Sequence, residues 1–231
     1  MTNGKVASGQ PVQQSTSIKA TVTIDSYYTE LAVSSLGTGG STEGQYTAAR
    51  NLSEFVDTSK NSGGYYIGRY EASESSSALM SQYNKAPLVS VTQAEAATKA
   101  RAMYNEVKSN NNLLYASDLV NSYAWDTAVI FIQTYSNKTD ASNYSKSNNS
   151  SSTMVNTGKT IDKYCNIWDM SGNAEEWTTA QSSLTDGSAK PCVCRGGNYS
   201  SNTTTVTRQS KTNTASETCG FRVLLYVNSS N

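Results

Sequence analysis

A long polar stretch divides this chain into two parts of different character. Residues 136–160 are rich in Asn, Ser, Thr and Lys and contain few apolar side chains. Such a stretch cannot supply a core element, so we expect it to form a long exposed loop. The sequence before it includes two segments with the apolar spacing of helices, and the sequence after it has the short apolar runs of strands. This arrangement predicts an α+β domain.

Two segments before the loop are predicted to be helices. Ser90 or Thr92 can cap a first helix that runs to about Lys108. Its predicted buried face consists of Ala96, Ala100, Tyr104 and Val107. The second predicted helix begins at Ser117 and ends near Tyr135. Its predicted buried face consists of Val120, Ala124, Ala128 and Phe131.

Short strands are predicted on both sides of the loop from their β-branched and aromatic content. They cover residues 18–24, 65–70, 191–195 and 220–227, and a short helix is predicted at residues 51–58. Residues 167–177 carry two tryptophans and a methionine around a Ser-Gly-Asn turn. We expect residues 1–60 to be a polar lead-in or attachment segment and residues 61–231 to form one domain.

The charge balance and the absence of one residue type exclude several functions. Eighteen basic residues offset eighteen acidic ones, so the sequence lacks the net positive charge expected of a nucleic-acid-binding protein. The chain has no histidine. This excludes serine-histidine triads, cysteine-histidine dyads and histidine metal sites together. Any catalysis would depend on Cys, Lys, Tyr or carboxylate side chains.

Hydropathy predicts no membrane span. No apolar run approaches the length of about eighteen residues that a spanning helix needs. Residues 1–14 also lack the apolar core of a signal peptide. We therefore expect a protein displayed outside the cell or on a virion, either after removal of an export segment or by assembly into a particle.

Four cysteines lie in the C-terminal third, at positions 165, 192, 194 and 219. A zinc site is disfavoured because Cys192 and Cys194 are too close in sequence and would share one strand face. In an exported protein, two disulfides are expected, with Cys219 bonded to Cys192 or Cys194 and Cys165 bonded to the other. The alternative is that buried thiols pack as small apolar side chains.

Five motifs occur in an order that is found in a known family. They are Gly64-Tyr65-Tyr66-Ile67-Gly68-Arg69-Tyr70-Glu71, Pro87-Leu88-Val89-Ser90-Val91, Asp169-Met170-Ser171-Gly172-Asn173-Ala174-Glu175-Glu176-Trp177, Arg195-Gly196-Gly197 and Gly220-Phe221-Arg222. Together they resemble the formylglycine-generating enzyme, or sulfatase-modifying-factor, domain family over about residues 63–227. The resemblance implies a C-type lectin-like fold, in which two helices pack on short twisted antiparallel sheets with long loops.

The resemblance also identifies what this chain lacks. The copper-dependent oxidases of the family use two cysteines at positions that match Ser201 and approximately Val206 here. A serine hydroxyl cannot supply the thiolate that binds Cu(I). The sulfoxide-synthase branch binds iron through histidines, and this chain has none. We therefore expect a protein that is not an enzyme and requires no cofactor.

One metal site of the family is compatible with the sequence. A calcium-binding turn resembles the set Asp169, Gly172, Ala174 and Glu176, where two carboxylates and two backbone carbonyls could surround a hard cation. Asp169 departs from the asparagine of the family pattern. The alternative without metal is that Glu176 accepts hydrogen bonds from the turn while Trp168 and Trp177 fill the core.

The chain also resembles the variable proteins of diversity-generating retroelements, which display a diversified segment between a Gly-Gly motif and a terminal Gly-Phe-Arg motif. Residues 198–218 occupy that place, and residues 198–205 are drawn from Asn, Ser, Thr and Tyr alone. The candidate ligand-binding residues are Asn198, Tyr199, Ser201, Asn202, Thr203, Thr205, Arg208, Ser210, Lys211, Asn213 and Thr214.

The expected partner is a protein or a glycan on a target surface. A fixed ligand surface in the same place is an equal alternative to a diversified one. An oxidase or another enzyme of the family, and a structural module of a pilus or phage tail, are the other functions that we considered.

Overall fold

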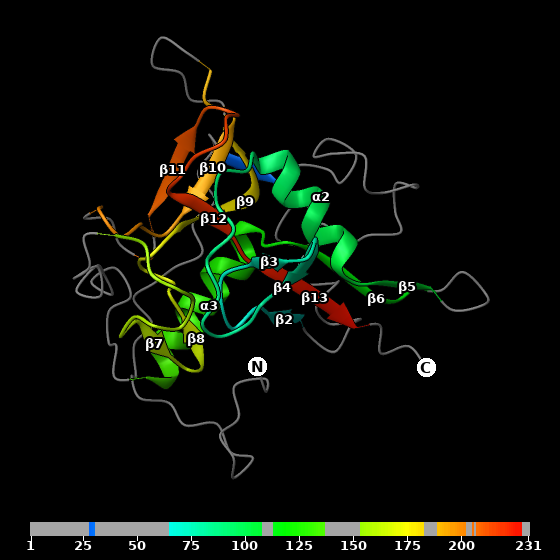
Figure 1. Cartoon of the computed structure of the whole chain (residues 1–231), viewed down its shortest axis with the longest axis horizontal. Helices are drawn as coiled ribbons and strands as arrows, with labels where there is room; N and C mark the ends of the chain where they lie inside the picture. Colours follow the sequence, from blue (N-terminus) through cyan, green and yellow to red (C-terminus); the bar gives the residue numbers. More distant parts are fainter. Residues whose placement is uncertain are drawn as a thin grey trace.

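The computed structural model describes residues 28–30, 65–107, 113–136, 153–182, 189–201, 205 and 207–227. Figure 1 shows two helices among several small sheets. The predicted strand at 18–24 and the predicted helix at 51–58 lie outside the described residues, as does most of the predicted loop at 136–160. The described part of the chain is mixed α+β, as predicted from the sequence.

The larger sheet is built around β9 (Glu175–Ser182). Its strand order is β1-β9-β10-β11, with β1 at Tyr28–Glu30, β10 at Cys192–Arg195 and β11 at Arg208–Lys211. These neighbours pair antiparallel, whereas β12 (Cys219–Phe221) pairs with β9 in parallel. Because β1 comes from the predicted lead-in segment, at least these three residues of that segment belong to the sheet.

A second sheet has the antiparallel order β2-β13-β6-β5. Its strands are β2 (Tyr65–Ile67), β13 (Val223–Val227), β6 (Leu113–Leu119) and β5 (Asn105–Val107). Two small hairpin sheets complete the described strands. They are β3 (Ser73–Ser75) with β4 (Ala78–Met80) and β7 (Lys163–Tyr164) with β8 (Ile167–Trp168).

Helix α2 (Gln93–Met103) begins at the second of the two predicted caps. The Thr92 hydroxyl accepts from the Glu95 amide at 3.2 Å, and the Glu95 carboxylate accepts from the Thr92 amide at 2.7 Å. This reciprocal pair is a capping box. Ala96 and Ala100 are buried as predicted.

The predicted end of α2 is wrong, because the chain is already extended at Tyr104. Tyr104 is 54% exposed, and Val107 belongs to β5 rather than to a helix face. The Ser117 hydroxyl accepts from the Tyr104 amide at 2.8 Å and donates to the Ala100 carbonyl oxygen at 2.6 Å. After the helix ends, the chain therefore continues as β5, which pairs with β6.

The second helix, α3 (Ser122–Tyr135), begins later than the predicted Ser117. Residues 113–119 form β6 instead, because their backbone groups pair with both β13 and β5. Asn121 caps α3 by accepting from the Ala124 amide at 2.7 Å. Ala124 and Ala128 are buried as predicted, Val120 is buried just before the helix, and Phe131 is only half-buried.

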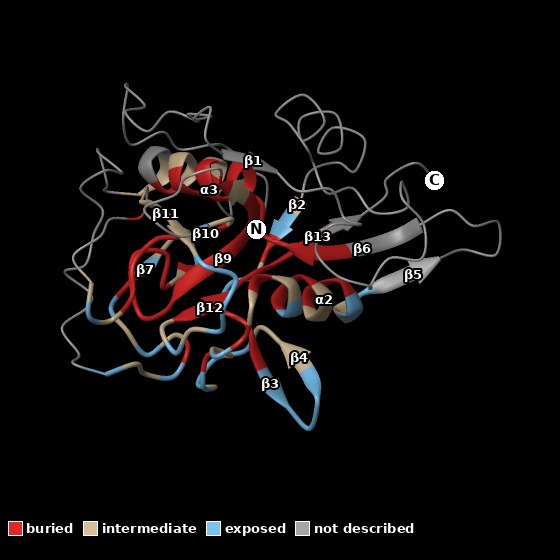
Figure 2. Ribbon diagram, turned by 90° about the horizontal axis from the view of Figure 1, so that it is seen from above, coloured by how far each residue is buried: buried red, intermediate tan, exposed pale blue. Residues whose placement is uncertain are grey.

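The core has two clusters on opposite faces of β13. Successive strand residues point to opposite faces, and Leu224 lies in one cluster while Val223 lies in the other. The first cluster packs around α3 and includes Trp125. The second packs around α2 and includes Trp177. Figure 2 shows the strands between the two helices as mostly buried.

Strand register decides which cysteines bond. Cys194 bonds Cys219. Cys219 pairs with Glu175 of β9 and Cys194 pairs with Trp177 close by, whereas Cys192 pairs with Gln181 much farther along the strand. This resolves the choice that the sequence left open.

The expected second disulfide between Cys165 and Cys192 is not formed. Cys165 lies between β7 and β8 and packs against the α3 cluster, whereas Cys192 is buried in the α2 cluster. The two thiols belong to different parts of the core. Burial raises the pKa of each of these thiols to about 11.

The other predicted strands are confirmed with shifted ends. The strand expected at 65–70 ends at Ile67, and the one expected at 191–195 begins at Cys192. The one expected at 220–227 is split into β12 and β13 at Arg222. Across the described residues, no helix has the length and apolar character of a membrane span.

Candidate functional site

The candidate ligand segment, residues 198–218, contains β11 and connects the end of β10 to the start of β12. Gly196 fixes the backbone just before this segment. Its φ is +71°, and an added Cβ would lie 2.8 Å from the Met170 carbonyl oxygen. A side chain is therefore disfavoured both by conformation and by space.

Glu175 at the start of β9 is the main anchor of the segment. One of its oxygens accepts from the Lys211 ammonium at 2.5 Å, from the Thr218 hydroxyl at 2.8 Å and, more weakly, from the Asn198 amide group at 3.5 Å. The residue is 1% exposed. One buried carboxylate thus holds the two ends of the segment and the end of β11 together.

Asn198 also organises the first turn. Its side-chain oxygen accepts from the amide and the hydroxyl of Ser200, both at 2.9 Å. The Ser201 hydroxyl accepts from the Asn198 amide at 2.9 Å, and the Tyr199 amide donates to the Asn173 carbonyl oxygen at 2.9 Å. The turn leaves Ser200 exposed and Tyr199 and Ser201 half-exposed.

Asp126 of α3 is the second anchor. Its carboxylate binds the guanidinium of Arg195 and, at 3.4 Å, that of Arg208. The Arg195 guanidinium lies over the Trp125 ring, 5.8 Å from its centroid. The Trp125 indole N–H donates to the Thr205 carbonyl oxygen at 2.8 Å. Helix α3 therefore holds the middle of the segment against the core.

The structure separates the predicted ligand residues into two groups. The frame residues are tied to buried partners or to the sheet, and they are Asn198, Thr205, Arg208, Ser210 and Lys211. The display residues are exposed or half-exposed, and they are Tyr199, Ser201, Asn213 and Thr214, together with Ser200 and Thr212. Asn202 and Thr203 lie outside the described residues.

Sequence reasoning missed both anchors. Glu175 stood inside the Asp169 to Trp177 motif, next to the glutamate that was singled out. A carboxylate in a strand that is buried at nearly every position needs a partner, which is a usable signal. Asp126 carried no comparable signal, since an acidic residue on a helix is usually solvated.

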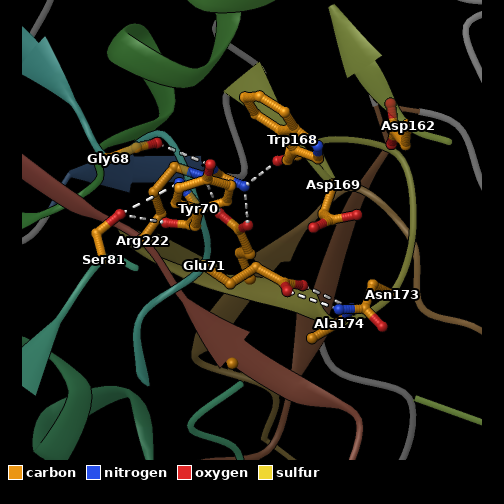
Figure 3. Close-up of polar contacts among 12 residues, drawn as sticks. Gly68, Tyr70, Glu71, Ser81, Asp162, Trp168, Asp169, Asn173, Ala174 and Arg222 are labelled. Carbon is orange, nitrogen blue, oxygen red and sulfur yellow. Dashed lines mark hydrogen bonds and ion pairs between the residues drawn. The ribbon is translucent and has the colours of Figure 1, made fainter. Parts of the chain in front are cut away.

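The four residues predicted to bind calcium are all buried, and Figure 3 shows two of them, Asp169 and Ala174, among the polar contacts near Arg222. Arg222 donates to both oxygens of Glu176, at 3.1 and 2.7 Å. It also donates to the carbonyl oxygens of Gly68 and Trp168, each at 2.7 Å. The Arg222 guanidinium thus contacts the Glu176 carboxylate that was expected to bind the cation.

Asp169 is also engaged by protein donors. Its carboxylate accepts from the Thr160 hydroxyl and from the Gly158 amide at 3.1 Å. Among the described residues, no three potential ligand side chains are grouped so as to hold a metal ion. Calcium at Asp169, Gly172, Ala174 and Glu176, bound through two carboxylates and two backbone carbonyls, stays a prediction that titration would test.

Burial dominates the electrostatics of this network. It raises the pKa of Glu71 well above its usual range, and the neighbouring Asp169 and Glu176 add to the rise. The Glu71 carboxyl accepts from the Ala174 amide at 2.8 Å and from the Asn173 side chain at 2.7 Å. Burial also raises the pKa of Asp169 to about 6. These carboxyls stabilise the turn beneath the Asn198 segment rather than face solvent.

Comparison with known proteins agrees with this fold. The sulfatase-modifying factor enzyme 1-like domain model matches residues 38–227. The chain belongs to this family. The family match begins upstream of the motifs found in the sequence and includes all five of them.

The crystal structure of CarF is similar at 15% sequence identity with a TM-score of 0.41, and the match covers 90% of this chain and all of that one. None of the curated proteins is detectably similar in sequence.

Proposed function

We propose that this family member is a non-catalytic ligand-binding protein, and that residues 198–218 on a C-type lectin-like scaffold form its ligand surface. One observation carries the proposal. Within this single segment, the frame residues are fixed by Glu175, Asp126 and the sheet, while the display residues face outward. Exposed side chains on a fixed backbone can vary without disturbing the fold.

The physical properties of the segment favour binding. A backbone that is already held in place loses little conformational freedom when a ligand binds, so the ordering cost is low. The display residues combine Tyr199 with small hydroxyl and amide side chains, a mixture similar to antibody paratopes. The ligand would be a protein or a glycan outside the cell or on a target surface, and the disulfide is compatible with such an oxidising location.

The same segment argues against the family's copper chemistry. Ser201 occupies the position of one of the two oxidase cysteines, and its hydroxyl hydrogen-bonds the Asn198 backbone. A neutral hydroxyl is a poor ligand for Cu(I), which needs soft thiolates.

Copper titration tests the non-catalytic role. We expect no tight Cu(I) binding and no turnover in a peptide oxidation assay, with a copper-dependent oxidase of the family as the positive control. Tight binding accompanied by turnover would overturn the proposal in favour of an oxidase.

The proposal extends to diversification of the segment. The six display residues named above are Asn, Ser, Thr or Tyr, whereas the exposed Ala215 and Glu217 of the same segment are not. Asn, Ser, Thr and Tyr are residues that adenine-directed mutagenesis readily produces from Asn codons. Sequencing the genome around the gene tests this extension. A reverse-transcriptase gene and a near-copy of the codons for residues 195–222 should lie nearby, with differences at display rather than frame positions. Without them, a fixed ligand surface would replace the diversified one.

A further inference from the structure

The charges of this chain balance over its length, but four cations gather on one side of the fold. We propose that this side is a second binding surface, which takes an acidic segment of a partner protein. We call it the basic aromatic face. It consists of Arg69, Lys85, Lys159 and Lys163 with the rings of Tyr70, Tyr83 and Trp168.

The rings form one continuous row. The centroids of Trp168 and Tyr70 are 5.0 Å apart, and those of Tyr70 and Tyr83 are 6.1 Å apart. The Lys163 ammonium lies 4.5 Å from the centroid of Trp168, and the Lys159 ammonium lies 4.9 Å from that of Tyr83. The row therefore has a positive charge at each end.

Backbone contacts join the chain at the other two basic residues to the segments that carry this row. The Trp168 amide donates to the Arg69 carbonyl oxygen at 2.9 Å, and the Thr157 amide donates to the Lys85 carbonyl oxygen at 2.8 Å. Gly158 packs so closely on the rings that an added Cβ would lie 2.6 Å from Tyr70. The segments that build the face are thus fixed relative to one another.

The acidic side chains in the segments that build this face are buried. The carboxylates in its segments are Glu71, Asp162 and Asp169, and each is at most 1% exposed. None of the four cations forms an ion pair with another described residue, whereas Lys99, Arg101 and Lys211 on other elements do. A positive potential without local neutralisation selects a negative partner and accelerates the encounter with it.

Two exposed apolar side chains indicate a polypeptide rather than a simple anion. Ile161 is 72% exposed and Tyr83 is 48% exposed. Ile161 lies between Lys159 and Lys163 in the sequence. Aromatic anchors surrounded by charged residues are typical of protein interfaces, where the apolar contacts supply affinity and the charges supply specificity. Figure 1 shows β7 and β8, which carry part of this face, well apart from β10 and β11.

Binding of defined polymers to the whole protein tests the proposal. The probe is a random copolymer of glutamate and tyrosine, compared with poly-glutamate and with polygalacturonate. We expect saturable binding of the copolymer that weakens as salt screens the charges. The double variant Lys159→Glu/Lys163→Glu should lower this affinity roughly tenfold or more. Tyr83→Ser should weaken binding of the copolymer more than binding of poly-glutamate.

The matched control is Lys99→Glu/Lys190→Glu, which changes the net charge equally on other elements. This control variant should retain binding. If the reversed charges of Lys159→Glu/Lys163→Glu prevent folding, Lys159→Gln/Lys163→Gln is measured in its place. Equal loss in face and control variants would overturn the proposal, because net charge alone would then explain binding. Polygalacturonate binding as tight as that of the copolymer would assign the face to anionic glycans instead. Absence of copolymer binding at low salt would also refute it.

Discussion

At the scale of single residues, two buried ionic groups hold the candidate site in place. Glu175 accepts from three residues of the ligand segment through one oxygen. Arg222 connects Glu176 to two backbone carbonyls on other parts of the chain. Each group is buried, so removing one partner would leave a charge with poor solvation. Their contribution is to fix local geometry around the site.

Glu175→Gln tests the anchor. The substitution keeps the shape of the side chain but removes its charge, so Lys211 loses its ion pair and the segment loosens. We expect the free energy of unfolding to fall by about 1–3 kcal/mol, measured in urea. Amide hydrogen exchange around residues 198–201 should become faster. The matched control is Glu217→Gln, an exposed side chain within the same segment, which should change stability by less than about 0.5 kcal/mol. Unchanged exchange in Glu175→Gln would contradict the anchoring role.

At the scale of elements, β9 organises the molecule. It pairs with β1, β10 and β12, so segments distant in the sequence meet along one strand. The Trp177 indole donates to the Val91 carbonyl oxygen at 2.9 Å, and Gln93 of α2 donates to the Thr178 and Ala180 carbonyl oxygens. The disulfide connects β10 and β12, the two strands that enclose the ligand segment.

Cys194→Ser tests the contribution of this disulfide. The bond closes a sequence separation of 25 residues, and loss of that constraint should lower the free energy of unfolding by about 3 kcal/mol. Thermal unfolding measures the change, and Cys165→Ser, which removes an unbonded and half-buried thiol, is the control. Alkylation of unfolded, unreduced wild-type protein should modify Cys165 and Cys192 alone. Four modified thiols in exported protein would refute the bond.

At the scale of the whole molecule, buried carboxyls make stability depend on pH. Glu71, Asp169 and Glu176 are all buried near Arg222. Burial is the largest cause of the raised pKa values of Glu71, Asp169 and Glu176. A raised pKa means that the native state holds the proton more tightly than the unfolded chain does. Each such group therefore favours the native state at low pH and loses that contribution as pH rises.

Asp169→Asn should show this dependence. The pKa of Asp169 rises from 3.8 to about 6 on folding, so its contribution is complete below about pH 4 and lost by about pH 6. Over this window, the variant should gain up to about 3 kcal/mol of unfolding free energy relative to wild type. Urea unfolding at successive pH values measures it.

Glu95→Gln is the control with the opposite sign, because hydrogen bonds from Thr92 lower the pKa of Glu95. The stabilising contribution of Glu95 is present at higher pH and lost as pH falls through its native pKa. A constant difference between Asp169→Asn and wild type from pH 4 to 6 would contradict the assignment of Asp169.

Local sequence determined the helices and the scaffold of the site. The Thr92 cap, the alanine faces of both helices and the strand content around Cys194 depend on neighbouring residues, so they could be predicted. The Gly-Gly and Gly-Phe-Arg motifs likewise marked the limits of the candidate segment. The polar composition of that segment was visible without coordinates.

Tertiary structure alone decided what depends on distant partners. Residues 113–119 form a strand because β13 and β5 supply hydrogen bonds that the local sequence does not reveal. The strand register along β9 places Cys194 rather than Cys192 close enough to Cys219 for the disulfide. The frame residues differ from the display residues because Glu175, Asp126, Trp125 and the sheet hold the former in place. The basic aromatic face arises in the same way, since its cations are scattered in sequence and meet only when the chain folds.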